Sequence, residues 1–447
     1  MTDLHSSVID IDQGHREDSS ARPKFFTAVL ASSVGTVVEW YDFFLYATLS
    51  VFLSTLFFPA GDPTAALLLS VGALGTGYLL RPIGGLVFGH MGDRIGRKRT
   101  FVLTMMIMGF ATVAIGLLPT YAQVGLIAPV ALVILRLLQG LALGGEYGGA
   151  ATYLAESAPR NRVGYATSWI QTTAGFGLIF STGTILLLQG TLSPEAFKSW
   201  GWRIPFIASG LLVGISIWIR INLEESPVFA ELKRQGRLAA TPIKTSLTDR
   251  GNLKMMLIAL FGVSAGTAAV SGVVFLLTTI FLQGILKVSP TFATAGTVMG
   301  MILGTPAYVM FGALSDRIGR RKVILGGLIL NLIAVLPIFY ALSIAAATQN
   351  VVLLTALVFV ETVLFAMVYG PYAAFMTEVF PPQLRYTSVS LPFNLAFSLM
   401  GGLLPLVSLS LISATGNIYS GLAYPLKLLV VTIVVNAIWL RKPRATK

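Results

Sequence analysis

Long apolar runs, each about the length of a membrane-crossing helix, constrain this chain more than any other feature of its sequence. A helix needs about 20 apolar residues to cross roughly 30 Å of hydrocarbon. Twelve runs meet that requirement, at residues 26–56, 64–91, 100–119, 126–156, 163–188, 202–220, 255–283, 290–313, 323–345, 350–376, 387–411 and 422–440. The pattern predicts an all-α membrane protein with twelve transmembrane helices.

Composition excludes most soluble alternatives. Hydrophobic residues make up 55% of the chain and charged residues only 11%, whereas a soluble domain carries roughly a quarter charged residues. The chain has no cysteine and three histidines, so we expect neither a metal site nor a disulfide. No strand followed by a phosphate-binding glycine loop is present. We therefore expect no cofactor, no catalytic residue and no enzymatic activity.

The apolar runs divide the chain into two groups of six. The longest polar stretch, residues 221–254, lies between the sixth and the seventh run. The predicted organisation is a cytoplasmic N-terminal tail (1–25), a six-helix bundle (26–220), a cytoplasmic linker loop (221–254), a second six-helix bundle (255–440) and a cytoplasmic C-terminal tail (441–447). The N-terminal tail is polar and lacks the pattern of a signal peptide.

Lysine and arginine set the predicted orientation, because they favour the cytoplasmic side of a membrane. With both termini inside, 25 of the 31 cations lie on the cytoplasmic side and four on the opposite side. Two more, Arg81 and Arg136, lie within apolar runs. The formal net charge of +12 thus reflects topology in a lipid bilayer, and we expect no nucleic-acid partner.

A string of charged residues recurs in the two halves. GHMGDRIGRKR at residues 89–99 matches GALSDRIGRRK at residues 312–322, at an offset of 223. Both strings follow an even number of predicted spans, which indicates parallel repeats related by an axis along the membrane normal. Two facing bundles of this kind enclose a central cavity, and their rocking exposes it to each side in turn.

These strings resemble the loop signature of the major facilitator superfamily. Three further stretches, VGTVVEWYDFFLY (34–46), RPIGGLVFGHMGDRIGRK (81–98) and RLLQGLALGGEYGGAATYLAESAPRNRVG (136–164), are similar to its metabolite:proton symporter branch. That branch includes bacterial carriers for 2-oxoglutarate, citrate, shikimate, and proline or betaine. The resemblance implies a transporter of the bacterial inner membrane whose partners are a small-molecule substrate and protons. It leaves the substrate open, and we expect a monomer.

Ionisable residues inside a span are costly and point to function. Glu39 and Asp42 are three residues apart near the middle of the first run, and Tyr46 continues their stripe. Two close carboxylates do not both ionise readily in a low dielectric, so one is expected to hold a proton. We predict proton coupling at Asp42 and Glu39, with Arg136 as their partner and Glu361 as a second proton site. The alternative for each carboxylate is a structural bond to a neighbouring helix.

The arginines also favour an anionic substrate. Arg136 lies about 14 Å into its run, near the midplane, where it either binds a substrate carboxylate or pairs with a carboxylate of the first run. The predicted substrate-binding residues are Arg136, Arg81, Tyr46, Gln171 and Tyr369. Aromatic side chains in the same region could instead hold a quaternary ammonium group.

The repeated charged strings are also candidates for a gate. The resemblance implies that Asp93 closes the cytoplasmic face by bonding to a cation or a helix N-terminus across the bundle interface. The predicted network comprises Asp93, Arg94, Arg97, Glu156, Arg162, Asp316, Arg317, Arg320, Glu378 and Arg385. The alternative is that these cations only fix the topology.

The sequence thus favours proton-coupled symport of a small mono- or dicarboxylate by alternating access. Two alternatives stay open: symport of a zwitterionic osmolyte such as proline or betaine, and a sensor that keeps the fold without transport.

Overall fold

The computed structural model describes residues 21–58 and 63–440. Most of the predicted N-terminal tail and the whole predicted C-terminal tail lie outside the described residues. Within them the chain is helical and contains no strand. Eleven helical stretches are long and apolar enough to cross a membrane. The remaining predicted run, 64–91, lies within α2 (Pro63–Ile95), a helix of 33 residues.

The N-terminal half contains helices α1 to α9. Besides α2 these are α1 (Ala21–Phe57), α3 (Arg97–Leu117), α4 (Tyr121–Val124), α5 (Ile127–Ser157), α6 (Val163–Gln171), α7 (Thr173–Thr191), α8 (Pro194–Ala196) and α9 (Arg203–Ile221). A 3₁₀ turn, Arg160–Arg162, precedes α6, and a π-helical turn, Phe197–Gly201, follows α8. The helices α6 and α7 together form one predicted span.

Two short helices connect the halves, α10 (Pro227–Arg234) and α11 (Pro242–Thr248). The C-terminal half then contains α12 (Arg250–Ala259), α13 (Ala265–Gly272), α14 (Thr278–Ile280), α15 (Pro290–Gly304), α16 (Pro306–Ile318), α17 (Arg320–Ala347), α18 (Val351–Tyr369), α19 (Tyr372–Glu378), α20 (Arg385–Leu395), α21 (Leu404–Thr415) and α22 (Ala423–Trp439). Its π-helical turns are Leu260–Ser264, Val273–Leu277, Phe281–Ile285 and Ala396–Gly401.

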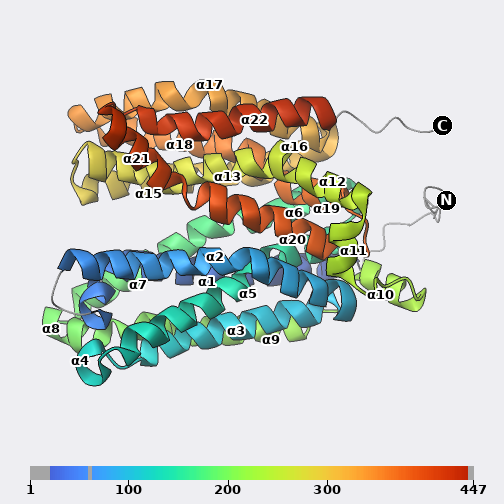
Figure 1. Cartoon of the computed structure of the whole chain (residues 1–447), viewed down its shortest axis with the longest axis horizontal. Helices are drawn as coiled ribbons and strands as arrows, with labels where there is room; N and C mark the ends of the chain where they lie inside the picture. The colour runs from blue at the N-terminus through green and yellow to red at the C-terminus, as the bar shows by residue number, and fades with distance from the viewer. Residues whose placement is uncertain (1–20, 59–62, 441–447) are drawn as a thin grey trace.

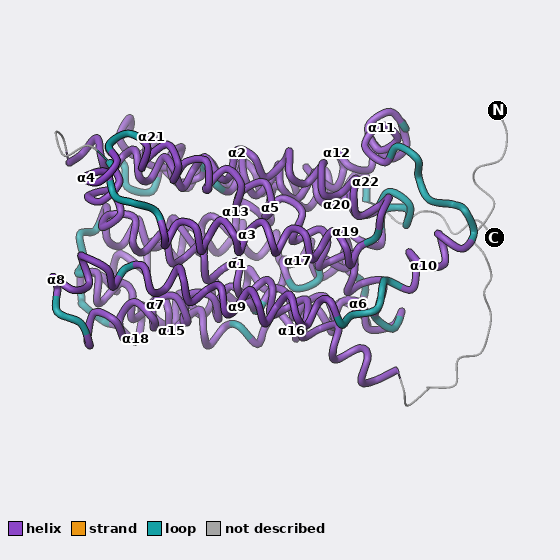
Figure 2. The backbone as a smooth tube through the Cα atoms, turned by 90° about the horizontal axis from the view of Figure 1, so that it is seen from below, coloured by secondary structure: helices purple, strands orange, loops and turns teal. Residues whose placement is uncertain are grey.

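The two halves lie side by side with their long helices roughly parallel (Figure 1). The helices α10 and α11 lie at one end of the molecule, here called the linker end (Figures 1 and 2). The helices α4 and α8 lie at the opposite end, here called the far end. This arrangement is the pair of helical bundles that the internal repeat predicts.

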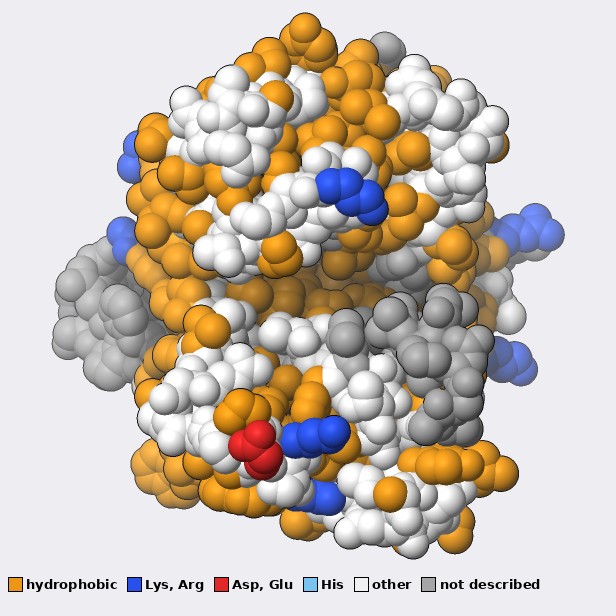
Figure 3. Space-filling view, turned by 90° about the vertical axis from the view of Figure 1, so that its left-hand side faces the viewer, with side chains coloured by type: hydrophobic (Ala, Val, Ile, Leu, Met, Phe, Trp, Pro, Cys, Tyr) orange, Lys and Arg blue, Asp and Glu red, His pale blue; other side chains and the backbone are white. Residues whose placement is uncertain are grey.

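The outer surface of the bundle is apolar. Leu211 on α9, Trp218 on the same helix and Val352 on α18 are each at least 70% exposed. Exposed apolar side chains on this scale are costly in water but suit a lipid environment. Viewed from the far end, hydrophobic side chains cover the flanks of both halves, and a recess separates the halves (Figure 3).

Glycines on α5 permit two close helix contacts. A Cβ atom at Gly140 would overlap the backbone of Gly77, and one at Gly144 would overlap the carbonyl of Arg81. One turn further on, a Cβ at Gly148 would collide with Ser390 of the other half. Small residues at this spacing let helix backbones approach closely. The stripe thus fixes α2 against α5 and positions Arg81.

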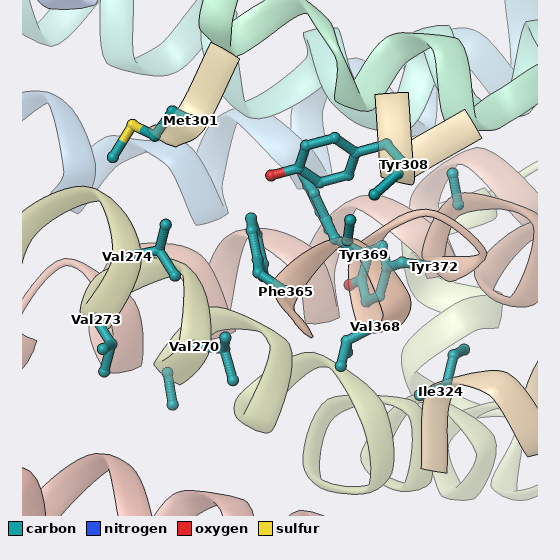
Figure 4. Close-up of a cluster of buried hydrophobic side chains, with 14 of the residues drawn as sticks. Val270, Val273, Val274, Met301, Tyr308, Ile324, Phe365, Val368, Tyr369 and Tyr372 are labelled. Atoms are coloured by element: carbon teal, nitrogen blue, oxygen red, sulfur yellow. The ribbon is translucent and has the colours of Figure 1, made fainter. Parts of the chain in front are cut away.

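The largest apolar cluster lies mainly in the C-terminal half. Phe365 and Tyr369 of α18 stack at 5.0 Å between ring centroids, and Tyr308 of α16 meets Phe365 edge-on at 5.8 Å. Figure 4 shows these rings beside Val270 and Val274. The cluster packs the helices that form one wall of the cavity described below.

Candidate functional site

At the linker end, the first repeated string joins the two halves through Asp93. This buried carboxylate at the end of α2 accepts hydrogen bonds from the backbone N–H groups of Tyr386 (3.2 Å) and Thr387 (2.9 Å) and from the Thr387 hydroxyl (2.8 Å). The two donor residues, Tyr386 and Thr387, lie in the first turn of α20. A carboxylate there satisfies free N–H groups and opposes the positive end of the helix dipole.

The second string makes the reciprocal contact. Asp316 at the end of α16 accepts from the N–H groups of Gly164 (2.9 Å) and Tyr165 (2.8 Å) at the start of α6. Each half therefore caps a helix of the other half with the aspartate of its own string. In both strings the following glycine, Gly96 or Gly319, has a positive φ, a conformation that favours glycine.

A buried ion cluster reinforces this closure. Arg97 lies 3.2 Å from the carboxylate of Glu156 and donates to the carbonyl of Pro382 in the other half at 2.7 Å. Arg385 of the other half contacts the same Glu156 at 3.0 Å. The guanidinium of Arg97 is also 3.3 Å from Asp93. These contacts hold the halves together at the linker end.

Among the described residues, the second half forms no equivalent bridge. Glu378 pairs with Arg320 of its own half at 2.9 Å, and Arg320 also pairs with Asp316 at 2.5 Å. Three other predicted gate residues are exposed and form no ion pair within the described part of the chain; they are Arg94, Arg162 and Arg317.

Between the halves lies a cavity of about 810 Å³, counting the part open to solvent. We call it the central cavity. Nine aromatic side chains line it: Trp40, Phe43, Phe44, Tyr78, Tyr147, Phe275, Tyr369, Phe393 and Phe397. Its charged lining residues are Glu39 of α1 and Arg81 of α2. The linker end beneath it is closed, and the recess in Figure 3 lies at the far end.

Glu39 and Arg81 form a loose pair in the cavity wall. Their closest charged atoms, Oε1 and Nη2, are 3.7 Å apart. The second carboxylate oxygen of Glu39 and the Nε of Arg81 are buried without a hydrogen-bond partner among the described residues. The pair therefore leaves a polar atom of each residue unsatisfied in the cavity wall.

A second cavity of about 420 Å³ adjoins this pair, and we call it the inner cavity. Glu39 and Arg81 line both cavities, and Asp42 and Arg136 line only the inner one. Asp42 accepts a short hydrogen bond from Thr112, whose hydroxyl in turn accepts from Gln139 at 2.6 Å. Thr112 and Gln139 are not predictable from the sequence, because an uncharged hydroxyl or amide within a span does not stand out from residues that only pack helices.

Arg136 pairs with neither Glu39 nor Asp42 within the described residues. Its guanidinium carbon lies 3.4 Å from the ring centroid of Tyr46, a cation–π contact. Tyr46 is fully buried and donates to the carbonyl of Ser70 at 3.2 Å. Neither Arg136 nor Tyr46 lines the central cavity, because both point toward the interior of the N-terminal half.

The other two predicted binding residues do line the central cavity. Gln171 of α6 donates to the hydroxyl of Tyr147 at 2.8 Å, which fixes its amide. Tyr369 of α18 lies in the opposite wall. Tyr147 stacks on Phe393 with 3.8 Å between ring centroids, so residues of both halves meet in the lining of the cavity.

Two buried acids lie elsewhere. Glu146 pairs with Arg220 at the end of α9, a short contact, and accepts from Thr104 at 2.9 Å. The role of Arg220 is not predictable from the sequence, because a cation at the end of an apolar run is usually a cytoplasmic loop residue. Glu361 lies in the C-terminal half and contacts Thr278. No group of three or more acidic or histidine side chains within the described residues is placed to hold a metal ion.

Comparison with known proteins defines the class. The sequence model that describes the Major Facilitator Superfamily matches residues 35–405 of the chain. The chain therefore belongs to this superfamily of membrane transporters, and the resemblance predicted from its motifs is confirmed.

Individual relatives narrow the class. The chain is 37% identical over 399 residues to the inner membrane metabolite transport protein YhjE of Escherichia coli K12, covering 85% of this chain and 86% of the relative. It is 35% identical over 417 residues to the shikimate transporter of the same strain, covering 92% and 93%. It is 32% identical over 410 residues to the citrate-proton symporter of Salmonella typhi, covering 89% and 90%. The protein is thus an integral, multi-pass membrane transporter.

A solved structure agrees on the fold. A crystal structure of a double tryptophan mutant of XylE superposes with a TM-score of 0.73 at 19% identity, covering 93% of this chain and 95% of that one. At this identity the likeness shows the two-bundle fold alone.

Proposed function

We propose that this protein is a proton-coupled symporter that carries a small organic acid, a mono- or dicarboxylate, by alternating access. The observation that carries the proposal is the loose pair of Glu39 and Arg81, which lines both the central and the inner cavity. A carboxylate and a permanently charged guanidinium so placed link the substrate's charge to a proton.

The coupling follows from competition for Arg81. While Glu39 is ionised, its carboxylate pairs with the guanidinium of Arg81 at 3.7 Å. A proton on Glu39 removes that charge, and the carboxylate of a substrate then takes its place on Arg81, whose fork suits bidentate binding. Proton and anion thus enter together. Asp42, in the inner cavity, is the second acid that can receive the proton.

Arg136 has a supporting role in this scheme. Its charge faces the inner cavity and offsets that of Asp42, while Tyr46 holds the guanidinium by its ring. Substrate contacts come instead from Arg81, with Gln171 and Tyr369 in the same cavity.

The orientation of the protein in the membrane follows from the positive-inside rule. Lysine and arginine concentrate at the linker end, so we place that end, and with it both chain termini, in the cytoplasm of a bacterial cell. The conformation is then outward-facing, because the linker end is closed by the contacts of Asp93, Asp316 and Glu156. The inward-facing state requires these contacts to break. The proposed cycle assigns no catalytic role to any residue.

The names of the relatives support the substrate class. One is a citrate-proton symporter and another a shikimate transporter, and both substrates are organic acids. The guanidinium of Arg81 in the wall of the central cavity also supports an anion over a sugar.

The test is proton flux into proteoliposomes that contain a pH dye. The panel comprises mono-, di- and tricarboxylic acids with proline and betaine. We expect one class of acid to acidify the lumen, and Glu39→Gln to abolish the acidification. Glu195→Gln, at an exposed position in α8, is the matched control and should behave as wild type. Uptake of an acid that ignores the pH gradient would contradict the coupling.

A zwitterionic substrate is the second candidate, favoured by the nine aromatic side chains that line the central cavity. Rings can hold a quaternary ammonium group, while Arg81 holds its carboxylate. Acidification by betaine or proline, without competition from organic acids, selects this candidate. Binding of a ligand without any flux would instead identify a sensor.

A further inference from the structure

The C-terminal half encloses a carboxylate that the scheme above does not use. Glu361, in the middle of α18, is only 4% exposed. It lines a third cavity of about 350 Å³, the C-terminal cavity, which shares no lining residue with the central cavity. The other lining residues are Val270, Val273, Val274, Asn331, Val335, Ile338, Leu364, Pro425 and Leu429. All of them except Asn331 are apolar.

No cation compensates this carboxylate within the described residues. The helix α15 carries no charged residue, and neither do α13 and α14. Arg320 and Arg321 of α17 bond to Glu378 and Asn436, and Lys427 of α22 is exposed. An ionised carboxylate in such a site has lost its hydration without gaining a counter-charge, which is strongly unfavourable.

One side chain bonds to it. The hydroxyl of Thr278 lies 3.1 Å from one oxygen of Glu361 and 3.3 Å from the other. Thr278 begins α14, a helical piece of three residues between the π-helical turns Val273–Leu277 and Phe281–Ile285. Such turns break the regular hydrogen-bond ladder and often mark functional positions in a helix. The bond thus fastens an irregular segment to a regular helix.

The same segment reaches the substrate cavity. Phe275, three residues before Thr278, lines the central cavity and meets Phe365 edge-on at 5.8 Å. Phe365 follows Glu361 by one turn of α18 and stacks on Tyr369, another lining residue. A shift of α14 away from α18 therefore changes the wall that a substrate contacts.

We propose that Glu361 is a second proton-binding site, separate from the site at Glu39 and Asp42, and that its proton holds α14 against α18 in the outward-facing state. Loss of the proton leaves an anion whose only described donor is the hydroxyl of Thr278, and one hydroxyl does not replace the lost hydration. The segment then moves to admit water, and the wall at Phe275 follows. The proposal goes beyond the symport reaction, since it assigns a proton to the half that does not contain the Glu39–Arg81 pair.

Infrared difference spectroscopy tests the proton directly, without substrate or flux. In membranes titrated from acid to alkaline pH, a protonated carboxylic acid gives a carbonyl stretch that an ionised one lacks. We expect Glu361→Gln to remove one such band that persists at neutral pH in the wild type. Glu195→Gln should remove none. An unchanged band pattern in Glu361→Gln at neutral pH overturns the assignment.

A labelling experiment tests the hold on α14. The chain has no cysteine, so Ser271→Cys introduces a single thiol into the central cavity wall. We expect alkaline pH to change its labelling rate by an impermeant maleimide severalfold, and Glu361→Gln to abolish that dependence. Thr278→Val removes the bond but keeps the acid, and it should give the alkaline rate at every pH. Wild-type pH dependence in Glu361→Gln refutes the hold, whatever the substrate proves to be.

Discussion

Removing the charge of Asp93 should open the linker end. In Asp93→Asn, one oxygen remains to accept from Thr387, but the amide nitrogen cannot accept from the N–H of Tyr386. The bonds that survive also lose their charge assistance. Hydrogen bonds to a charged group are worth about 1.5–3 kcal/mol each and neutral ones about 1 kcal/mol. With one of the three bonds lost and two weakened, the outward-facing state loses roughly 2.5–7 kcal/mol.

That loss is large on the scale of a conformational equilibrium. At 1.4 kcal/mol for each factor of ten, it shifts the outward-to-inward ratio by about 60- to 100,000-fold. A starting ratio of about 99:1 becomes between about 3:2 and 1:1000. The inward-facing state then carries a measurable share of the population.

The absence of native cysteine makes the shift easy to follow. In the Ser271→Cys background, an impermeant maleimide applied from the far end should label Asp93→Asn more slowly than the parent. Asp316→Asn should act in the same direction but less strongly, because Asp316 makes two such bonds rather than three. Arg94→Gln, next to Asp93 but exposed and unpaired, is the matched control. Equal labelling of Asp93→Asn and the parent, with both folded, refutes the reasoning.

Three further substitutions test the packing and the inner cavity. Gly144→Ala places a methyl group against the carbonyl of α2 and should cost about 1–3 kcal/mol of unfolding free energy, whereas Gly214→Ala, with nothing described within 4 Å, should leave the melting temperature unchanged. Gly35→Ala collides with the guanidinium of Arg220 and, by breaking a buried ion pair, should lower the stability in the same melting assay by about 3 kcal/mol; a loss below that for Gly144→Ala would contradict this. Thr112→Val removes the hydroxyl that donates to Asp42 and accepts from Gln139, so proton-coupled uptake should fall severalfold; uptake equal to that of the wild type would contradict a role of this bond in the inner cavity.

The sequence predicts the helices well, because hydropathy is a local property that each run carries by itself. The repeat is predicted for the same reason, since a shared string needs no knowledge of contacts. The π-helical turns near Thr278 have no such local signature. Hydropathy alone therefore predicts one regular helix over 255–283.

The site is harder to predict, because depth along a helix can be counted but rotation about its axis cannot. Arg81 and Arg136 both lie within spans, and depth alone favours Arg136, the one nearer the midplane, as the main contact of the substrate. The structure turns Arg81 toward the central cavity and Arg136 toward Tyr46. Partners far apart in the sequence are equally hidden, as Glu146 and Arg220 show.

The reciprocal caps at the linker end have a consequence for how the two halves separate. Asp93 bonds to the first turn of α20, and Asp316 bonds to the first turn of α6, so the contact pattern is that of an isologous dimer, in which a patch on each subunit meets the same patch on its copy. The two halves therefore meet like the two subunits of a pseudo-symmetric dimer joined in one chain. The joint is reinforced unevenly, because Glu156 bridges to Arg385 across it while Glu378 pairs with Arg320 of its own half. A nearly symmetric joint with one stronger side need not part evenly: the weaker contact at Asp316 is the one that should yield first.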